Sequence, residues 1–138
     1  MRPNPNIRQY AVEQARMLLR RLAYQANRFL QNTDAGAVHD LRVAARRFGQ
    51  CLRVFGCFFP RKERKVRRRL RELMSLSSEV RNRDIALGLI ERAGVTEGSE
   101  LVRSLAGERA KAERDLVGLI EAWRRRGFSR RWRAQLEL

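Results

Sequence analysis

The chain has 138 residues, the size of one domain, and its 31 Lys and Arg against 15 Asp and Glu give a formal net charge of +16 at pH 7. Because 43% of the residues are hydrophobic, the chain can bury an apolar core, which excludes a disordered basic tail. So much positive charge repels itself, and it predicts an anionic partner: nucleic acid, an anionic membrane surface or another chain of phosphates.

Four stretches of the sequence repeat apolar residues every three or four positions, which predicts four amphipathic helices. They span about residues 6–31, 37–57, 61–92 and 99–125. A turn at 32–36, the pair Phe59-Pro60 and a break at 94–98 separate them. After Gly127, residues 128–138 have room for a short fifth helix. We therefore expect an all-α fold, an antiparallel four-helix bundle with a short C-terminal fifth helix, as a single domain over residues 1–138.

Each predicted helix has one apolar stripe that we expect to be buried. On the first and fourth helices the stripes are Ala11, Ala15, Leu18, Leu22, Ala26 and Phe29, and Leu101, Leu105, Ala112, Leu116, Leu119 and Trp123. On the second and third helices they are Leu41, Ala44, Ala45, Phe48, Leu52 and Phe55, and Val66, Leu70, Leu73, Ser77, Val80 and Asp84. The polar residues late in the last stripe predict that the core becomes functional or kinked there.

Positive charge is concentrated between Arg42 and Arg71, where twelve basic residues accompany one acid, Glu63. Solvated helix faces normally mix the two signs, so solubility does not explain this segment. Of the basic residues in the whole chain, 28 are Arg and 3 are Lys. A guanidinium group offers a planar fork that bonds phosphate oxygens in pairs, whereas the ammonium of Lys is a point charge. The segment is therefore typical of a surface that binds phosphates.

The second predicted helix carries a polar row on the side opposite its leucines and phenylalanines. Each residue turns the helix by roughly 100°, so four later residues lie within about 60° of His39 around the helix axis: Arg42, Arg46, Gln50 and Arg53. Arg47 flanks this row. A linear phosphate chain could contact several of these residues at once. His39 also lies near the start of the helix, where backbone N–H groups and the helix dipole favour an anion. We expect the row to face outward and to be open to a ligand.

The third predicted helix extends the basic surface. Lys62, Lys65 and Arg69 lie on one of its flanks, at spacings of three and four residues. Further arginines surround the start of this helix on its other sides: Arg61, Arg64, Arg67, Arg68 and Arg71. We expect the group to form part of the same anion-binding surface.

Two segments resemble a known family. The run VHDLRVAARRF, residues 38–48, resembles the V-H-x-x-R-V-x-x-R-R signature of the CHAD family, the conserved histidine α-helical domain. The run VRNRDI, residues 80–85, is similar to the family's V-R-D-x-D-V element, with Asn82 where the family has an acid. The resemblance covers about residues 38–87 and implies a helical bundle that binds inorganic polyphosphate through a basic surface or pore. It implies this role for His39, Arg42, Arg46, Arg47, Arg53 and Arg81, to which the helix faces add Lys62, Lys65 and Arg69.

The chain is about half as long as a typical CHAD domain, in which two similar helical halves enclose a basic channel. Either two copies pair to rebuild the channel, or the chain is a reduced or excised version of the domain; of these we expect the homodimer. Cys51 and Cys57 lack the spacing for a bridge on one helix or for a metal site, which indicates reduced thiols in a cytoplasmic protein. The sequence has neither a membrane-spanning run nor a signal-peptide-like run after Met1 to Pro5. The family resemblance further implies association with polyphosphate granules.

Nothing in the sequence indicates catalysis, a metal or a cofactor. It contains one His, no Gly-rich phosphate loop and no paired carboxylates beside a basic cleft. Of the nearby acids, Glu79 and Asp84, we expect the second to orient an arginine.

Two other functions are consistent with the charge. The first is a basic helical nucleic-acid-binding protein, which we rank lower because aromatic residues make up only 7% of the chain and fall mostly on apolar stripes, leaving little to stack on bases. The second is a helical adaptor whose charge steers an acidic protein partner.

Overall fold

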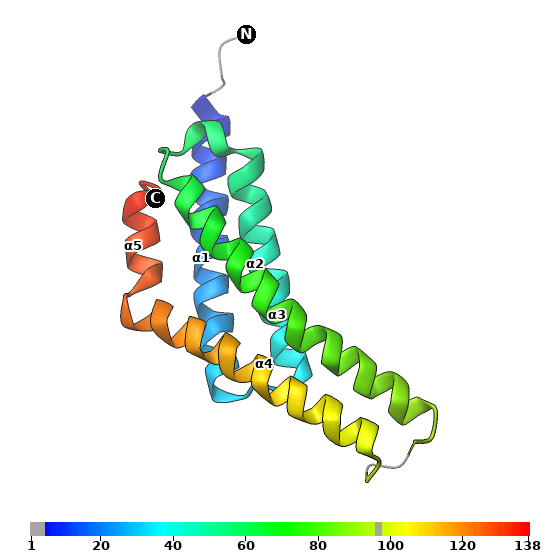
Figure 1. Ribbon diagram of the computed structural model, residues 1–138. Helices are drawn as coiled ribbons and strands as arrows, with labels where there is room; N and C mark the ends of the chain where they lie inside the picture. The colour runs from blue at the N-terminus through cyan, green and yellow to red at the C-terminus, as the bar shows by residue number, and fades with distance from the viewer. Residues whose placement is uncertain (1–4, 96–97) are drawn as a thin grey trace.

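The computed structural model describes residues 5–95 and 98–138. Residues 1–4, which belong to the N-terminal segment considered above, and residues 96–97, inside the predicted break at 94–98, lie outside the described residues. The described chain contains no strand, which confirms the all-α prediction (Figure 1). Its elements are α1 Pro5–Gln31, α2 Ala35–Val54, the 3-10 turn η1 Gly56–Phe58, α3 Glu63–Arg92, α4 Glu100–Arg125 and α5 Phe128–Gln135.

The helix ends differ from the predicted bounds by a few residues. The Asp34 side chain caps α2 by accepting a hydrogen bond of 2.8 Å from the backbone N–H of Ala37, so this helix begins two residues earlier than expected. Ser99 caps α4 in the same way through the N–H of Val102, at 3.1 Å. The second helix ends at Val54 and not at residue 57, because η1 takes over at Gly56 and turns the chain toward α3.

Successive helices pack side by side, α1 against α2, α2 against α3 and α3 against α4. The contact between α4 and α1 that would close the bundle is much smaller. The chain reverses at Gly127, whose φ of 61° favours glycine, and α5 then packs against α1 (Figure 1). The end of α4 and the short α5 thus each make a small contact with α1, and together they close the bundle.

The predicted stripes are buried on α2 and α3 with two exceptions, the half-exposed Phe55 and Asp84. On α1, Leu19 and not Leu18 is fully buried. On α4 the prediction was partly wrong. Ile120 is buried in place of Leu119, and Leu101 is 55% exposed because α1 and α2 do not extend as far as this end of α4.

This packing divides the molecule into two parts. We call residues 5–80 and 116–138 the base, and residues 81–95 and 98–115, which form the far ends of α3 and α4, the arm. The arm projects beyond α1 and α2 (Figure 1), and none of its described residues is fully buried. Its exposed apolar side chains are Ile85, Leu89, Val95 and Leu101. In the described residues, no helix combines the length and apolar character needed to cross a lipid bilayer.

Candidate anion-binding site

Arg42 occupies the interface between α2 and α3. Its Nη1 donates hydrogen bonds to Ser77 Oγ and Ser78 Oγ, both at 2.8 Å, and to the backbone oxygen of Met74 at 3.1 Å. The predicted outward orientation is therefore wrong for this residue. The two small serine side chains leave room for the guanidinium, which joins the helices instead of pointing into solvent.

The remaining members of the row, His39, Arg46, Gln50 and Arg53, are exposed, which confirms the outward orientation for them. Three of them border a groove of about 270 Å³ between α2 and α3, which we call the α2–α3 groove. The α2 side of the groove consists of Ala45, Arg46, Gly49, Gln50 and Arg53, and the α3 side of Arg67, Leu70, Arg71 and Met74. The fold thus places a phosphate-sized trough between two helices that both carry arginines.

Most of the charge along this groove is not neutralised. Arg67 forms an ion pair with Glu63, with Nε and Oε2 2.7 Å apart. In residues 5–95 and 98–138, no acidic side chain forms an ion pair with Arg46, Arg53 or Arg71. The groove therefore retains a positive potential that an anion would lower.

The pKa of Arg42 is also affected by nearby positive charge. Burial lowers this pKa first, and repulsion by the nearby charges of Arg46 and Arg81 lowers it further. Arg81 is half-buried on α3, where the arm begins. The charges of Arg46 and Arg81 therefore act on Arg42 with the same sign, and a negative ligand nearby would relieve this repulsion.

The other predicted residues lie elsewhere. Arg47 borders a separate groove between α1 and α2, together with Arg20 and Arg21. Lys65 and Arg69 border a pocket between α3 and α5, on the opposite flank of α3 from the α2–α3 groove. Lys62 is exposed in the turn that precedes α3. The nine predicted residues therefore do not form one patch, because α2 and α3 each have two flanks that face different neighbours.

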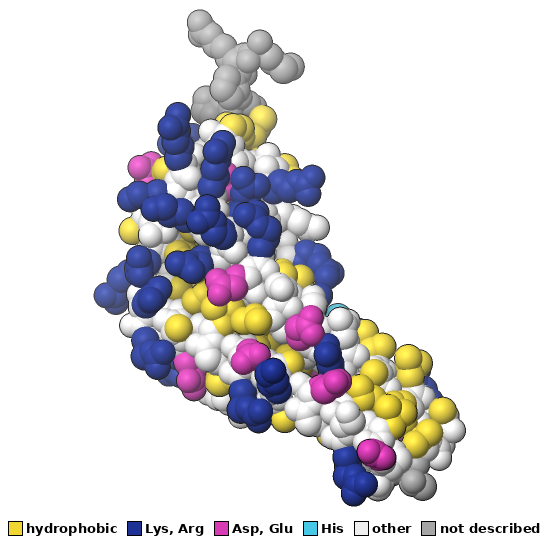
Figure 2. All heavy atoms as spheres, viewed as in Figure 1, with side chains coloured by type: hydrophobic (Ala, Val, Ile, Leu, Met, Phe, Trp, Pro, Cys, Tyr) yellow, Lys and Arg dark blue, Asp and Glu magenta, His cyan; other side chains and the backbone are white. Residues whose placement is uncertain are grey.

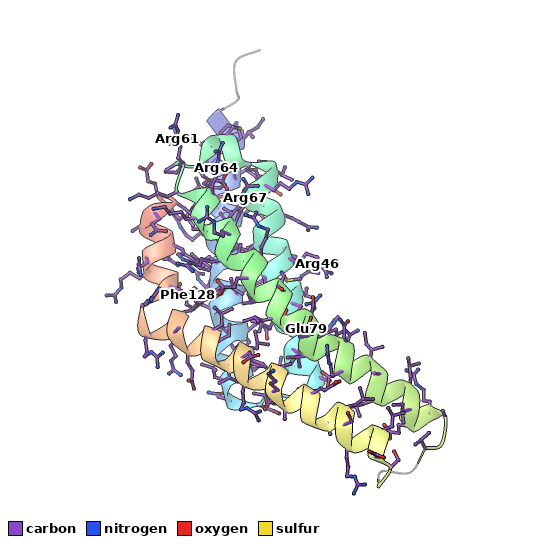
Figure 3. The ribbon with its side chains drawn as sticks, in the orientation of Figure 1. Arg46, Arg61, Arg64, Arg67, Glu79 and Phe128 are labelled. Carbon is purple, nitrogen blue, oxygen red and sulfur yellow. The ribbon has the colours of Figure 1, made fainter. Side chains whose placement is uncertain are left out.

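The sequence placed Arg71 only among the arginines around the start of α3 and did not predict that it lies opposite Arg46 and Arg53. Its signal was present, because Arg67 and Arg71 are four residues apart beside the buried Leu70, on one flank of α3. Only the packing shows that this flank, and not the flank of Lys65, faces α2. Figure 3 shows Arg67 on α3 and Arg46 on the neighbouring α2.

Asp84 orients an arginine, as expected, and the partner is Arg109 of α4. Arg109 Nε lies 2.9 Å from Asp84 Oδ1, and its other nitrogens bond Glu113 Oε1 at 2.6 Å and the backbone oxygen of Thr33 at 2.7 Å. Burial alone would lower the pKa of Arg109, but the two carboxylates outweigh it and raise the pKa. The cluster fastens α3 and α4 to the turn before α2, and it is a structural feature.

The described residues contain no group of three or more His, Cys, Asp or Glu side chains that could hold a metal ion. Cys51 is buried on α2 and Cys57 is exposed in η1, so the two cysteines do not lie on one helix as expected, and both are free thiols. Burial raises the pKa of the Cys51 thiol.

No curated protein and no solved structure is significantly similar to the chain. The family described as "CHAD domain" matches residues 13–137. This match extends well beyond the two segments that carry the resemblance and includes α3, α4 and α5. The chain therefore belongs to the CHAD domain family.

Proposed function

We propose that the protein binds inorganic polyphosphate along the α2–α3 groove. The observation that carries the proposal is the set of guanidinium groups on both sides of this groove, Arg46, Arg53 and Arg71, which form no ion pair within the described chain. Guanidinium forks match the oxygens of successive phosphates, and arginines at intervals of one or two helical turns engage a linear chain repeatedly. Membership in the CHAD family supports the same ligand.

The lining of the groove favours polyphosphate over nucleic acid. None of its residues is aromatic, so it provides no ring on which a base could stack. Contacts to phosphates alone are sufficient for a polymer that consists only of phosphates. Arg42 acts in this proposal as a positioning residue, because it holds α3 against α2 while adding to the positive potential.

The deciding experiment is a competition. The protein is immobilised and offered long-chain polyphosphate, single-stranded DNA and double-stranded DNA at about 0.15 M salt, where the screening length is about 8 Å and weak exposed contacts fade. We expect polyphosphate to displace both nucleic acids at equal phosphate concentration. Displacement of polyphosphate by either nucleic acid would show that the alternative function, nucleic-acid binding, is the correct one.

We also propose that binding is not followed by hydrolysis. The lining of the α2–α3 groove contains no carboxylate and no histidine that could act as a general base or hold a metal. Incubation of the protein with polyphosphate, with and without Mg²⁺, is expected to release no more orthophosphate than buffer. Sustained release that scales with protein concentration would contradict this.

We propose further that two copies of the chain pair in the cytoplasm, where they would associate with polyphosphate granules. One copy presents its basic groove without a facing wall, and its arm exposes four large apolar side chains that a second copy could cover. Sedimentation of only monomer, both with and without polyphosphate, would exclude the dimer. A fluorescent fusion that stays diffuse in cells rich in granules would exclude the location.

A further inference from the structure

A second basic pocket lies on the other flank of α3, where α3, α4 and α5 meet. Its volume is about 220 Å³. Four cationic side chains border it, two from α3 and two from the end of α4 and from α5: Lys65, Arg69, Arg126 and Arg131. Val66, Trp123, Phe128, Trp132 and Gln135 complete the lining, which contains no acid. We call it the α3–α5 pocket.

The aromatic residues make this pocket a fixed feature of the fold. The ring centroids of Trp123 and Trp132 are 4.9 Å apart, and Phe128 lies 5.1 Å from Trp132 and 5.4 Å from Trp123. Each of the three side chains is more than nine-tenths buried. Together with the reversal at Gly127, this cluster sets the direction of α5 and so brings Arg131 toward α3. The core therefore holds the backbone segments that place these four cations around one pocket.

Their charge is almost uncompensated. Arg69 has one exposed and long contact, 3.6 Å from Nη1 to Glu72 Oε2, which contributes little. Lys65, Arg126 and Arg131 form no ion pair with the described residues. Four like charges around one small pocket raise its potential and favour a compact anion of high charge.

We propose that the α3–α5 pocket is a second phosphate-binding site, which takes a short run of phosphates, either the end of a polyphosphate chain or a free oligophosphate. Its volume is below the roughly 300–1,000 Å³ of pockets that hold small organic ligands. Its aromatic rings are too buried to stack on a base. Both facts favour a bare phosphate group over a nucleotide.

A band of cations joins this pocket to the α2–α3 groove. Arg67 and Arg71 face α2 on one flank of α3, whereas Lys65 and Arg69 border the pocket on the other. The outer surface between the flanks carries the exposed Arg61, Arg64 and Arg68. Figure 3 shows Arg61 and Arg64 at the start of α3, and Figure 2 shows Lys and Arg dominating this part of the surface. A chain held by its end in the pocket can thus continue around α3 into the groove. This continuation depends on the proposed function, whereas binding of a free oligophosphate does not.

The test uses sodium tripolyphosphate as the probe and three double variants of the whole chain. Arg126→Ala with Arg131→Ala removes cations from the pocket, Arg46→Ala with Arg53→Ala removes the same charge from the groove, and Arg103→Ala with Arg114→Ala removes it from exposed positions on α4 that border neither. Calorimetry measures affinity, and tryptophan emission reports locally because both tryptophans of the chain line the pocket. Circular dichroism checks the fold, and Lys65→Gln with Arg69→Gln replaces the pocket pair if that variant unfolds.

We expect the pocket variant to bind tripolyphosphate at least about tenfold more weakly than the α4 variant, because charge-assisted hydrogen bonds are lost. The emission change on binding should persist in the groove variant and disappear in the pocket variant. Equal affinity of the pocket and α4 variants, or absence of tripolyphosphate binding by the unmodified protein, would overturn the second site.

Long-chain polyphosphate distinguishes this failure from failure of the proposed function. If the groove variant alone weakens long-chain binding, the groove stands and the pocket does not hold the end of a long chain; the tripolyphosphate titration then decides whether the pocket is a site for free oligophosphate. If the pocket variant alone weakens long-chain binding, polyphosphate binds at the α3–α5 pocket and not along the α2–α3 groove. Loss of long-chain binding in both variants supports a chain that runs from pocket to groove.

Discussion

The base and the arm of this molecule use charge in opposite ways. In the base, a continuous apolar core holds the helices together, and many of the exposed arginines above it have no acidic partner in the described chain. In the arm, where none of the described residues is fully buried, two ion pairs connect α3 to α4. Figure 2 shows the same contrast, with a basic upper surface and a mixed lower one.

The long helix α3 runs through both the base and the arm. Its first half buries Val66, Leu70 and Leu73, while its second half is joined to α4 through Arg83–Glu108 and Asp84–Arg109 pairs. Cations therefore stay available for a ligand where packing already stabilises the fold. Where packing is thin, the charges are used for the fold itself.

The largest expected effect comes from the core of the base. Phe48 is fully buried and stacks on Trp132, with ring centroids 6.3 Å apart. Phe48→Ala should lower the free energy of unfolding by about 3–5 kcal/mol, whereas Leu89→Ala in the arm should change it by less than about 0.5 kcal/mol. Urea unfolding followed by circular dichroism measures both. Equal effects would mean that base and arm are not packed differently.

The next effect concerns the cluster that fastens the arm. Arg109→Met leaves the half-buried Asp84 without its partner, so we expect a loss of about 3 kcal/mol of unfolding free energy. The matched control is Arg103→Met on the exposed side of the same helix, which should be nearly neutral. If both variants unfold at the same urea concentration as the unmodified chain, ion pairs do not stabilise the arm.

Arg42 should contribute less than Arg109, because its partners are neutral oxygens and the buried Ser77 keeps its own bond to Met74. We expect Arg42→Met to lower the free energy of unfolding by about 2 kcal/mol. Arg53→Met, exposed on the same helix, is the control. Unchanged stability together with strongly weakened polyphosphate binding would make Arg42 a direct ligand-binding residue and not a positioning one.

Removing the groove cations should affect binding and not the fold. Arg46→Ala with Arg53→Ala is expected to weaken polyphosphate binding at least about tenfold and to reduce the salt dependence by about two counterions, without loss of helicity. The Arg103→Ala with Arg114→Ala variant, which carries the same net charge, should bind like the unmodified protein. Titrations at several salt concentrations measure both the affinity and its salt dependence. Loss of helicity in the groove variant would show that these arginines are structural.

The smallest perturbation is chemical modification of the two thiols. Cys57 is exposed to the reagent, whereas Cys51 is buried. Burial also raises the pKa of Cys51, so at pH 8 a smaller fraction of this thiol is the reactive thiolate than in an unburied cysteine. Iodoacetamide should therefore modify Cys57 first, as mass spectrometry after digestion can show. Equal rates would indicate that the base opens readily near the end of α2.

Periodicity alone predicted the helices, because burial of one face dictates the spacing of apolar residues whatever the partner is. The same spacing predicted the exposure of His39, Arg46 and Arg53, and the two motif segments predicted the family, which the match over residues 13–137 confirmed. Two errors in the apolar stripes were shifts by one position. Leu18 and Leu119 were chosen over Leu19 and Ile120 because neighbouring positions differ by only about 100° around a helix.

The sequence by itself determined the all-helical class, the concentration of arginine and the family. Only the tertiary structure decided which arginines meet. Packing placed Arg42 in the interface between α2 and α3, and it placed Arg71 and Arg46 on opposite sides of the α2–α3 groove. It also brought Arg126 and Arg131 to the flank of α3 that carries Lys65 and Arg69. The physical reason is that a helix has two flanks beside its buried stripe, and helix periodicity does not reveal which neighbour each flank faces.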